Sequence, residues 1–371
     1  MVPRLVQQLD AAIAQAEGVF ERESLKARRA AVLARHGSFA EARFALAGLR
    51  SQNQRLRNPL LAAWIALVDG LIEHCEALAP GAHEKFTRAH DLAEAAGAPA
   101  LQAEAAAWLA VTDFNANDLP ALVVHLAEAL RLAPADGHAA RARAALVAAD
   151  AYRFAGNDAA AEPWYRCVRR HATAEGDVSL VSMLLHNIAA FRAGRISLDD
   201  ALGGADREEC QRVLLEVEST GNYDAGVGNG QLLAMVPLLR AQLLVVLGAF
   251  DEAIAVFDAH LPRARGEGQA HREARYLADA AYAEVRLGRL DEAARRLRLI
   301  QTVLPLLGEP DDLAAAHARL AVVTRALGRD DAAAAHEARS QEARARHADE
   351  QRQLAEALDA GLAGLQEAVE G

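Results

Sequence analysis

The sequence contains few of the residues that build sheets, disulfide frameworks or membrane spans. Aromatic residues make up 5% of the 371 positions, and β-branched residues are too scattered to form strands. The three cysteines, Cys75, Cys167 and Cys210, form no CxxC pair, which indicates free thiols in a reducing compartment. The first twenty residues are interrupted by Arg4 and Asp10, and no window reaches the roughly 18 apolar residues of a membrane span. We therefore expect a cytoplasmic protein with no membrane partner.

The residues that are abundant favour helix almost throughout. Alanine is the most frequent residue, leucine, arginine and glutamate are also common, and all four have high helix propensity. Hydrophobic residues account for 52% of the chain, so a large core can form from Ala and Leu at close helix separations. The formal net charge of −11 argues against binding to nucleic acid, because neutralising phosphates requires a basic face. The composition predicts an all-α protein.

Similar short stretches recur along the chain at a nearly constant interval. "LGAFDEAIAVF" begins at Leu247, and "LGRLDEAARRL" begins forty residues later at Leu287. Each stretch contains a small residue that stops one helix, followed by acidic residues that favour the first turn of the next. Aligned on that residue, successive hinges lie 40, 40, 39, 40, 52, 40 and 40 residues apart. The predicted hinges, each joining two antiparallel helices, are Gly37, Ala77, Asn117, Gly156, Ile196, Gly248, Gly288 and Gly328.

The helix after each hinge carries its apolar residues on one face. They occur two, five, nine and twelve positions after the hinge, and the fifth position is usually alanine, as in Ala253 and Ala293. This pattern resembles the tetratricopeptide repeat (TPR) family over about residues 20–345. The resemblance implies a right-handed superhelical solenoid of about eight helix-turn-helix repeats, with longer helices because the period is 40 rather than 34 residues. We expect a capping helix in 1–20, the repeat array in 21–345, and the end of a long helix in 346–371.

The C-terminal segment predicts one long helix from Asp330 to about Val369. Its first part is too polar to be buried on more than a narrow stripe, whereas its second part carries an apolar ridge. The ridge either folds back as a terminal cap or pairs with a second copy to form a homodimer. It could also continue as a signalling helix toward an output domain. The ridge residues, spaced by three and four, are Leu354, Leu358, Leu362, Leu365 and Val369.

The interval of 52 residues predicts an insertion at about 202–231. We expect a helix from Arg207 to Ser219, followed by a flexible loop that makes Asn222, Tyr223 and Asn229 candidates for ligand contact. The glycines of "GVGNG" do not form a phosphate-binding loop, because no lysine follows in the required place and no strand precedes them.

No arrangement of residues in the sequence recommends a catalytic or metal site. The histidines form no HExxH motif, and His83 and His90 have no obvious acidic partner set for a metal. Ser182 and His186 are four residues apart, but no nucleophile elbow or oxyanion donor accompanies them. We expect no enzymatic activity and no cofactor.

The TPR resemblance implies a concave groove lined by the first helix of each repeat, which holds peptides or partner helices. Arginines dominate the groove positions, so we predict a groove that accepts an acidic peptide or a C-terminal carboxylate. Tyr282 would supply a stacking surface, and Asn115 and Gln242 would bond to the peptide backbone. Alternatively, the arginines are solvated or paired with Asp and Glu of adjacent helices. The predicted ligand-binding residues are Arg35, Asn115, Arg143, Asp150, Arg153, Gln242, Arg275, Tyr282, Arg286 and Arg325.

Three functions are consistent with these features. The first is a non-enzymatic scaffold or adaptor that binds a protein or peptide partner. The second is the sensing input region of a bacterial signalling protein, of the diguanylate cyclase or transcription activator type, without its output domain. The third is an enzyme whose site lies in the insertion near Tyr223. The repeat pattern favours the first, because stacked repeats build long binding surfaces.

Overall fold

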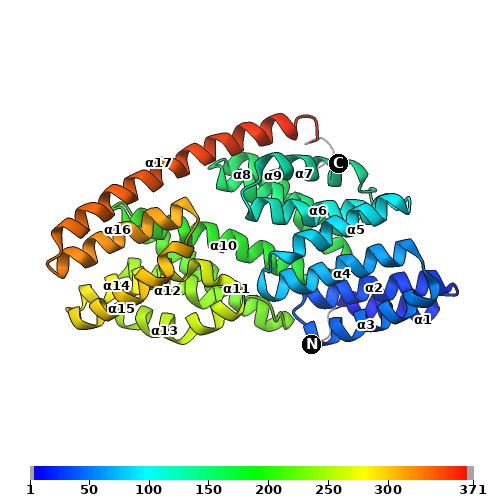
Figure 1. Cartoon of the computed structure of the whole chain (residues 1–371), viewed down its shortest axis with the longest axis horizontal. Helices are drawn as coiled ribbons and strands as arrows, with labels where there is room; N and C mark the ends of the chain where they lie inside the picture. The colour runs from blue at the N-terminus through cyan, green and yellow to red at the C-terminus, as the bar shows by residue number, and fades with distance from the viewer. Residues whose placement is uncertain (1–3, 366–371) are drawn as a thin grey trace. The chain divides into compact units, whose positions relative to one another are not determined.

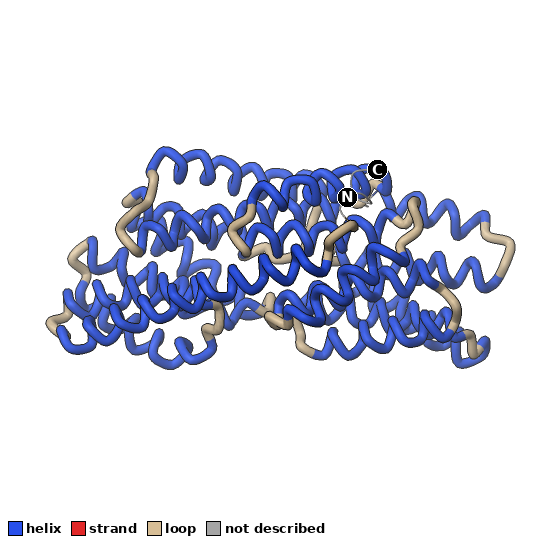
Figure 2. Tube along the Cα trace, turned by 90° about the horizontal axis from the view of Figure 1, so that it is seen from above, coloured by secondary structure: helices blue, strands red, loops and turns tan. Residues whose placement is uncertain are grey.

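The computed structural model describes residues 4–365, and these residues form helices joined by short loops, with no β-strand (Figures 1 and 2). The all-α class expected from composition is confirmed. No described helix is both long enough and apolar enough to cross a bilayer. The α-helices are α1 (Arg4–Gln15), α2 (Val19–Arg35), α3 (Phe39–Leu56), α4 (Pro59–Ala77), α5 (Gly81–Ala95), α6 (Pro99–Asn115), α7 (Leu119–Leu132), α8 (His138–Phe154), α9 (Asp158–Glu175), α10 (Val178–Ala201), α11 (Arg207–Val227), α12 (Met235–Leu247), α13 (Phe250–Gly266), α14 (Glu273–Arg286), α15 (Leu290–Val303), α16 (Pro310–Ala326) and α17 (Asp330–Gly361). Two short 3-10 helices, η1 (Gln269–Arg272) and η2 (Leu304–Leu306), complete the set.

The chain divides into two compact units. Unit 1 comprises the described residues of 1–184, 224–231 and 351–371, and unit 2 comprises 185–223 and 232–350. Helices α10, α11 and α17 each contain residues of both units. The chain therefore returns to unit 1 twice after leaving it, and distant segments of sequence meet inside that unit.

Seven of the eight predicted hinges lie at the ends of helices or in the turns between them. Gly37, for example, separates α2 from α3, and Gly248 separates α12 from α13. The hinge predicted at Ile196 is wrong, because α10 continues through it to Ala201. The Ile196 side chain is 4% exposed, so burial favours the helical backbone there, and the helix stops only at the glycine pair that begins at Gly203.

The segment predicted as an insertion is mostly helical. The helix expected at 207–219 is present, but α11 extends to Val227, so Asn222 and Tyr223 lie in a helix rather than in a flexible loop. Cys210, Val213 and Val217 of this helix are buried in the core of unit 2. With the hinge at Gly203, the intervals from Gly156 and to Gly248 are 47 and 45 residues, so the twelve extra residues are shared by the α10 and α11 pair instead of forming one loop.

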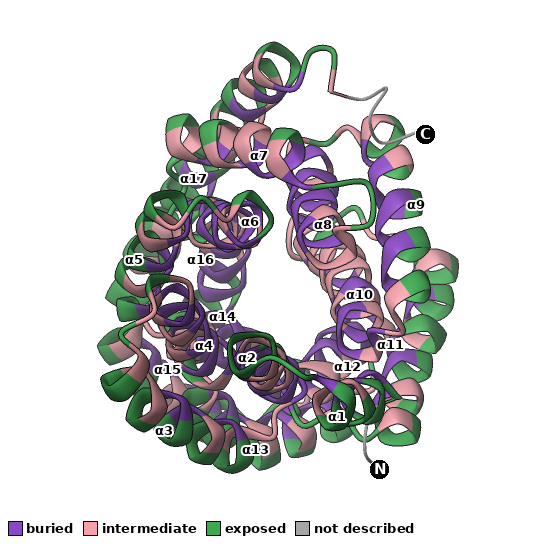
Figure 3. Cartoon of the chain, turned by 90° about the vertical axis from the view of Figure 1, so that its right-hand side faces the viewer, coloured by how far each residue is buried: buried purple, intermediate pink, exposed green. Residues whose placement is uncertain are grey.

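The two helices of each pair differ in burial. Of the 14 residues in α14, 11 are buried, whereas α15 of equal length buries three. In unit 1, α8 buries 12 of 17 residues and α9 buries seven of 18. Alanine fills the interior positions of α8, which allows close approach of neighbouring helices, and Figure 3 shows α3 and α13 with exposed outer turns. The first helices therefore carry the interior of each unit, together with the polar residues that lie on them.

The end of the long C-terminal helix packs on unit 1. Leu354, Leu358 and Leu362 of the predicted ridge are each at most 1% exposed, Leu365 is half-buried, and Val369 lies outside the described residues. The Gln351 side chain donates to the backbone carbonyl of Phe154 at 2.7 Å, at the end of α8. The described part of the ridge is thus covered by its own chain, as the cap alternative predicts.

A short segment that follows α11 is fixed against the end of α2. Gly230 donates its amide to the carbonyl of His36 at 3.2 Å, and the Gln231 side chain donates to the carbonyl of Ala34 at 3.1 Å. Gly37 has a φ of 83°, and a Cβ added there would lie 2.7 Å from the Gly230 carbonyl carbon. Asn229 donates to the Ser182 hydroxyl at 2.7 Å, so its side chain holds the segment in place. We call residues 228–231, which follow α11, the strap.

Candidate functional site

The ten residues predicted to bind a ligand all lie on first helices, and they are divided between the two units. Unit 1 contains Arg35, Asn115, Arg143, Asp150 and Arg153, and unit 2 contains Gln242, Arg275, Tyr282, Arg286 and Arg325. The buried members are Arg35, Arg143, Asp150, Gln242 and Arg275, the half-buried members are Arg153 and Tyr282, and the exposed members are Asn115, Arg286 and Arg325. Each unit therefore carries its own group of these side chains.

In unit 2, opposite charges forty residues apart in sequence meet between adjacent helices. The Arg272 Nε atom donates to Asp312 Oδ2 at 2.8 Å. In the reverse order, the Arg319 Nε atom donates to Asp279 Oδ1 at 3.0 Å. The forty-residue period thus appears as ion pairs that fix the register of α16 against η1 and α14.

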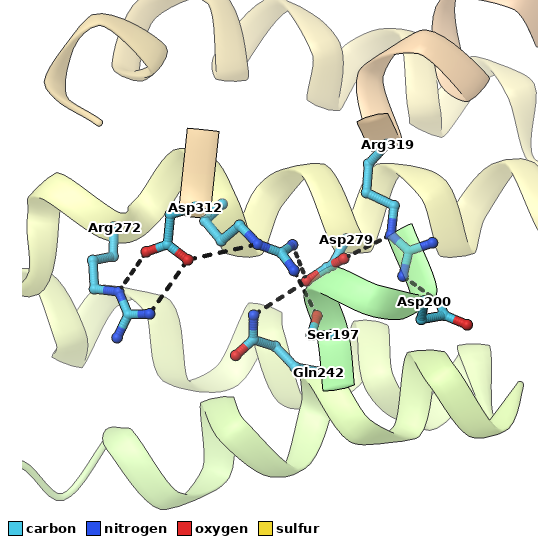
Figure 4. A network of polar contacts seen from close by, with 8 residues as sticks. Ser197, Asp200, Gln242, Arg272, Asp279, Asp312 and Arg319 are labelled. Carbon is cyan, nitrogen blue, oxygen red and sulfur yellow. Dashed lines mark hydrogen bonds and ion pairs between the residues drawn. The ribbon is translucent and has the colours of Figure 1, made fainter. Parts of the chain in front are cut away.

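Arg275 lies at the centre of these pairs and is 1% exposed. It contacts Asp279 directly, approaches Asp312 Oδ1 to 3.7 Å, and donates to the Ser197 hydroxyl. The Gln242 side chain donates to Asp279 Oδ2 at 3.4 Å, and Figure 4 shows the Asp279 carboxylate between these donors. We call this set the unit 2 network, and its charges balance because it contains Arg272, Arg275, Arg319, Asp200, Asp279 and Asp312.

The ion pairs of the unit 2 network favour the ionised form of the Asp312 carboxyl. Burial alone would raise the pKa of the Asp312 carboxyl, but Arg272 and Arg275 hold that pKa below its usual value. Asp312 in turn raises the pKa of the Arg272 guanidinium well above its ordinary value. Because each charge has a partner of opposite sign, this network requires no external ion, and its effect is to stabilise the packing of unit 2.

One exposed arginine of unit 2, Arg286, lies near this network without belonging to it. Arg286 is exposed, donates to the Tyr282 hydroxyl at 2.6 Å, and has no carboxylate partner among the described residues. Its guanidinium carbon lies 5.2 Å from the ring centre of Phe250 and 5.6 Å from that of Tyr282. The Arg319 guanidinium lies 4.1 Å from the same tyrosine ring. Tyr282 therefore connects the buried charges to an exposed cation beside two aromatic rings.

Most of the other predicted arginines have acidic partners, as the alternative to groove binding anticipates. Arg35 pairs with Asp177 at 3.0 Å, and Arg325 pairs with Glu337 at 2.7 Å. Arg153 pairs with Asp158 at 3.4 Å. Asp150 accepts a hydrogen bond of 2.9 Å from the Tyr165 hydroxyl. Of the six arginines, Arg143 and Arg286 are the two for which the described residues supply no carboxylate partner.

Arg143 lies in the interior of unit 1, against aromatic and polar side chains. It is 6% exposed, and its guanidinium carbon lies 4.1 Å from the ring centre of Trp108. The His74 ring meets the same indole in a T-shaped arrangement, with ring centres 5.5 Å apart. We call the group formed by Arg35, His74, Cys75, Trp108, Arg143 and Asp177 the Arg143 cluster.

Burial keeps the thiol and the imidazole of the Arg143 cluster neutral. It raises the pKa of the Cys75 thiol to about 11 and lowers the pKa of His74 to about 4, the second effect reinforced by the charge of Arg143. Burial and the charge of Arg35 lower the pKa of Arg143 to about 10, which still leaves it charged at neutral pH. Cys75 is therefore not a reactive thiolate, and the two arginines are the charged donors of the cluster.

Sequence reasoning missed the residues that complete both groups. The signal for Asp279, Asp312 and Arg319 was the recurrence of opposite charges at an interval of forty residues, which periodicity in apolar residues does not register. Asp177 had a local signal, because it precedes α10 and its Oδ1 accepts from the Leu180 amide as a helix cap. Trp108 had none, because an interior tryptophan has the same pattern whether or not an arginine stacks on it.

Comparison with known proteins does not assign the chain to a family. No family model matches the sequence, and no curated protein matches it. Within residues 4–365, no group of three or more His, Cys, Asp or Glu side chains is arranged to hold a metal ion.

Proposed function

We propose that the chain is a TPR-like helical-repeat module that binds an acidic segment of a partner protein and performs no catalysis. The paired helices and the ion pairs at forty-residue separation support a stack of about eight repeats in a right-handed solenoid. The three buried thiols Cys75, Cys167 and Cys210 are all free, which suits a reducing cytoplasm. The described part of the α17 ridge is covered by its own chain, which does not favour a homodimer through that helix.

The exposed guanidinium of Arg286 is the observation that carries this proposal. It is held by the Tyr282 hydroxyl and flanked by Phe250, so it is positioned before any ligand arrives. Its fork of donors fits a carboxylate, and the neighbouring rings can pack against the apolar part of a peptide. In a chain with a net charge of −11, an arginine without a carboxylate partner is a local site for an acidic ligand.

An array of random twelve-residue peptides tests this proposal. The purified protein should retain peptides that contain Asp or Glu beside an aromatic residue, and retention should fall as salt concentration rises. Arg286→Glu should weaken binding of a retained peptide by at least about tenfold, because the substitution replaces attraction of a carboxylate with repulsion. Fluorescence anisotropy of the labelled peptide measures this change.

Arg295→Glu is the matched control, since Arg295 is an exposed arginine on the second helix α15 with the same change of charge. Its affinity for the peptide should stay within about twofold of the wild-type value, because distant surface charges are screened. Equal losses in the two variants, or retained peptides without acidic residues, would contradict the proposal.

A further inference from the structure

Arg143 and Arg286 both lack a carboxylate partner among the described residues. Unlike Arg286, Arg143 is also buried. Its Nε atom is fully covered and has no hydrogen-bond partner, and no described carboxylate lies within ion-pair distance of its guanidinium. A buried charge without a partner is strongly destabilising, and folded proteins normally pair such groups. The stacking contact with Trp108 supports the flat guanidinium but supplies no hydrogen-bond acceptor.

The acidic groups around Arg143 lie outside ion-pair distance of its guanidinium, although Asp177 Oδ2 and Glu175 Oε2 are themselves buried without a hydrogen-bond partner. Asp177 pairs with Arg35 and caps α10, and Asp150 accepts from Tyr165. Glu175 lies 3.6 Å from Arg28. Burial, opposed in part by the charge of Arg35, raises the pKa of the Glu104 carboxyl and so favours its neutral form. The cluster therefore contains one arginine whose charge the surrounding carboxylates do not neutralise.

We propose that the Arg143 guanidinium is the anchor of a buried anion site in unit 1, and that the site takes a small monocarboxylate. A planar carboxylate matches two parallel donors of a guanidinium held flat on an indole ring. One negative charge balances Arg143, whereas a second would be repelled by Asp177 and Asp150, so a phosphate dianion fits less well. This site is independent of the acidic-peptide surface at Arg286.

Thermal unfolding in different sodium salts tests the site on the full chain. Acetate and butyrate are the probes, with chloride and inorganic phosphate at the same ionic strength and pH 7 for comparison. The wild-type melting temperature should rise saturably, by about 2 °C or more, in the carboxylates relative to chloride, because a ligand that binds the folded state stabilises it. Intrinsic tryptophan fluorescence should change over the same concentration range, since Trp108 lies under the arginine.

Three variants connect the effect to the arginine. Arg143→Met keeps the length and apolar contacts of the side chain and should abolish the carboxylate-dependent rise. Arg143→Lys keeps the charge without the planar fork and should weaken the apparent affinity at least about tenfold. Arg295→Met, at an exposed arginine outside both proposed sites, should leave the rise unchanged. The peptide assay uses Arg286→Glu, so failure of the peptide proposal and failure of this one are distinguishable. If Arg143→Met does not fold, the Lys variant still decides the result.

Several results would overturn the proposal. A wild-type rise in acetate and butyrate no larger than in chloride means that no such site exists. A rise that persists in folded Arg143→Met, or at full affinity in Arg143→Lys, places the anion elsewhere. A larger rise in phosphate than in the carboxylates rejects the assigned ligand class.

Discussion

The two units contain similar buried arginines in opposite electrostatic situations. Arg275 in unit 2 is surrounded by aspartates and a serine hydroxyl, and the network around it contains equal numbers of positive and negative groups. Arg143 in unit 1 has an indole ring beneath it and no described carboxylate partner. A buried arginine is therefore not itself a sign of function. Its role depends on its neighbours: we expect a structural role where carboxylates neutralise the guanidinium and a binding role where they do not.

The largest expected effect separates these two arginines directly. Arg275→Met should lower the free energy of unfolding by about 3–5 kcal/mol, because it leaves the Asp279 and Asp312 carboxylates buried with fewer partners. Arg143→Met should leave the free energy unchanged or raise it, because it removes an uncompensated buried charge and keeps the contact with Trp108. Urea denaturation followed by circular dichroism at 222 nm measures both. Equal losses in the two variants would mean that residues of unit 1 do neutralise the charge of Arg143.

A substitution at Gly37 tests how tightly the strap packs against the end of α2 in unit 1. Gly37→Ala should lower the free energy of unfolding by about 2–3 kcal/mol, since alanine is strained at a φ of 83° and its Cβ would meet the backbone of Gly230. Gly97→Ala is the control, because Gly97 has a φ of 64° with nothing within 4 Å of the added Cβ. It should cost about 1 kcal/mol from strain alone. Equal costs would show that the strap is not tightly packed.

Each unit contains a pair of histidines whose rings lie close together. His138 and His171 in unit 1, and His317 and His336 in unit 2, approach with their Nδ1 atoms 2.9 Å apart. Burial, helped by the positive charge of a neighbouring residue, lowers the pKa of His171 and of His317 to about 4. The unfolded chain binds protons at about pH 6.5, so the stability from each pair is full above that pH and falls toward pH 4.

Between pH 7 and pH 5 each pair should therefore lose about 1–2 kcal/mol of stability. His171→Gln and His317→Gln should each reduce the pH dependence of urea denaturation by a similar amount, because each removes one of the buried neutral imidazoles. A much larger effect in one unit would show that the units differ in more than their arginines.

The helices could be predicted from the sequence, but the partners of their polar side chains could not. Seven hinges followed from small residues and acidic first turns, which are local signals. The hinge predicted at Ile196 was wrong. The alignment assumed a fixed spacing, whereas burial of the isoleucine favours helix at that position. The arginine positions were found, but Asp177 meets Arg35 across 142 residues of sequence, and the strap reaches α2 from even farther. Such contacts depend on the path of the chain, which the local pattern does not encode.

The smallest expected effects concern ion pairs at the surface. Arg50 in unit 1 lies 2.9 Å from Asp69, and Arg289 in unit 2 pairs with Asp251, with both arginines about half exposed. Arg50→Ala and Arg289→Ala should each change the free energy of unfolding by less than about 0.5 kcal/mol, because water screens exposed charges and the side chains lose entropy when they pair. A loss from Arg289→Ala as large as that from Arg275→Met would contradict the premise of the comparison. It would show that pairing alone, without burial, accounts for the stability of unit 2, and the missing partner of Arg143 would then carry no energetic weight.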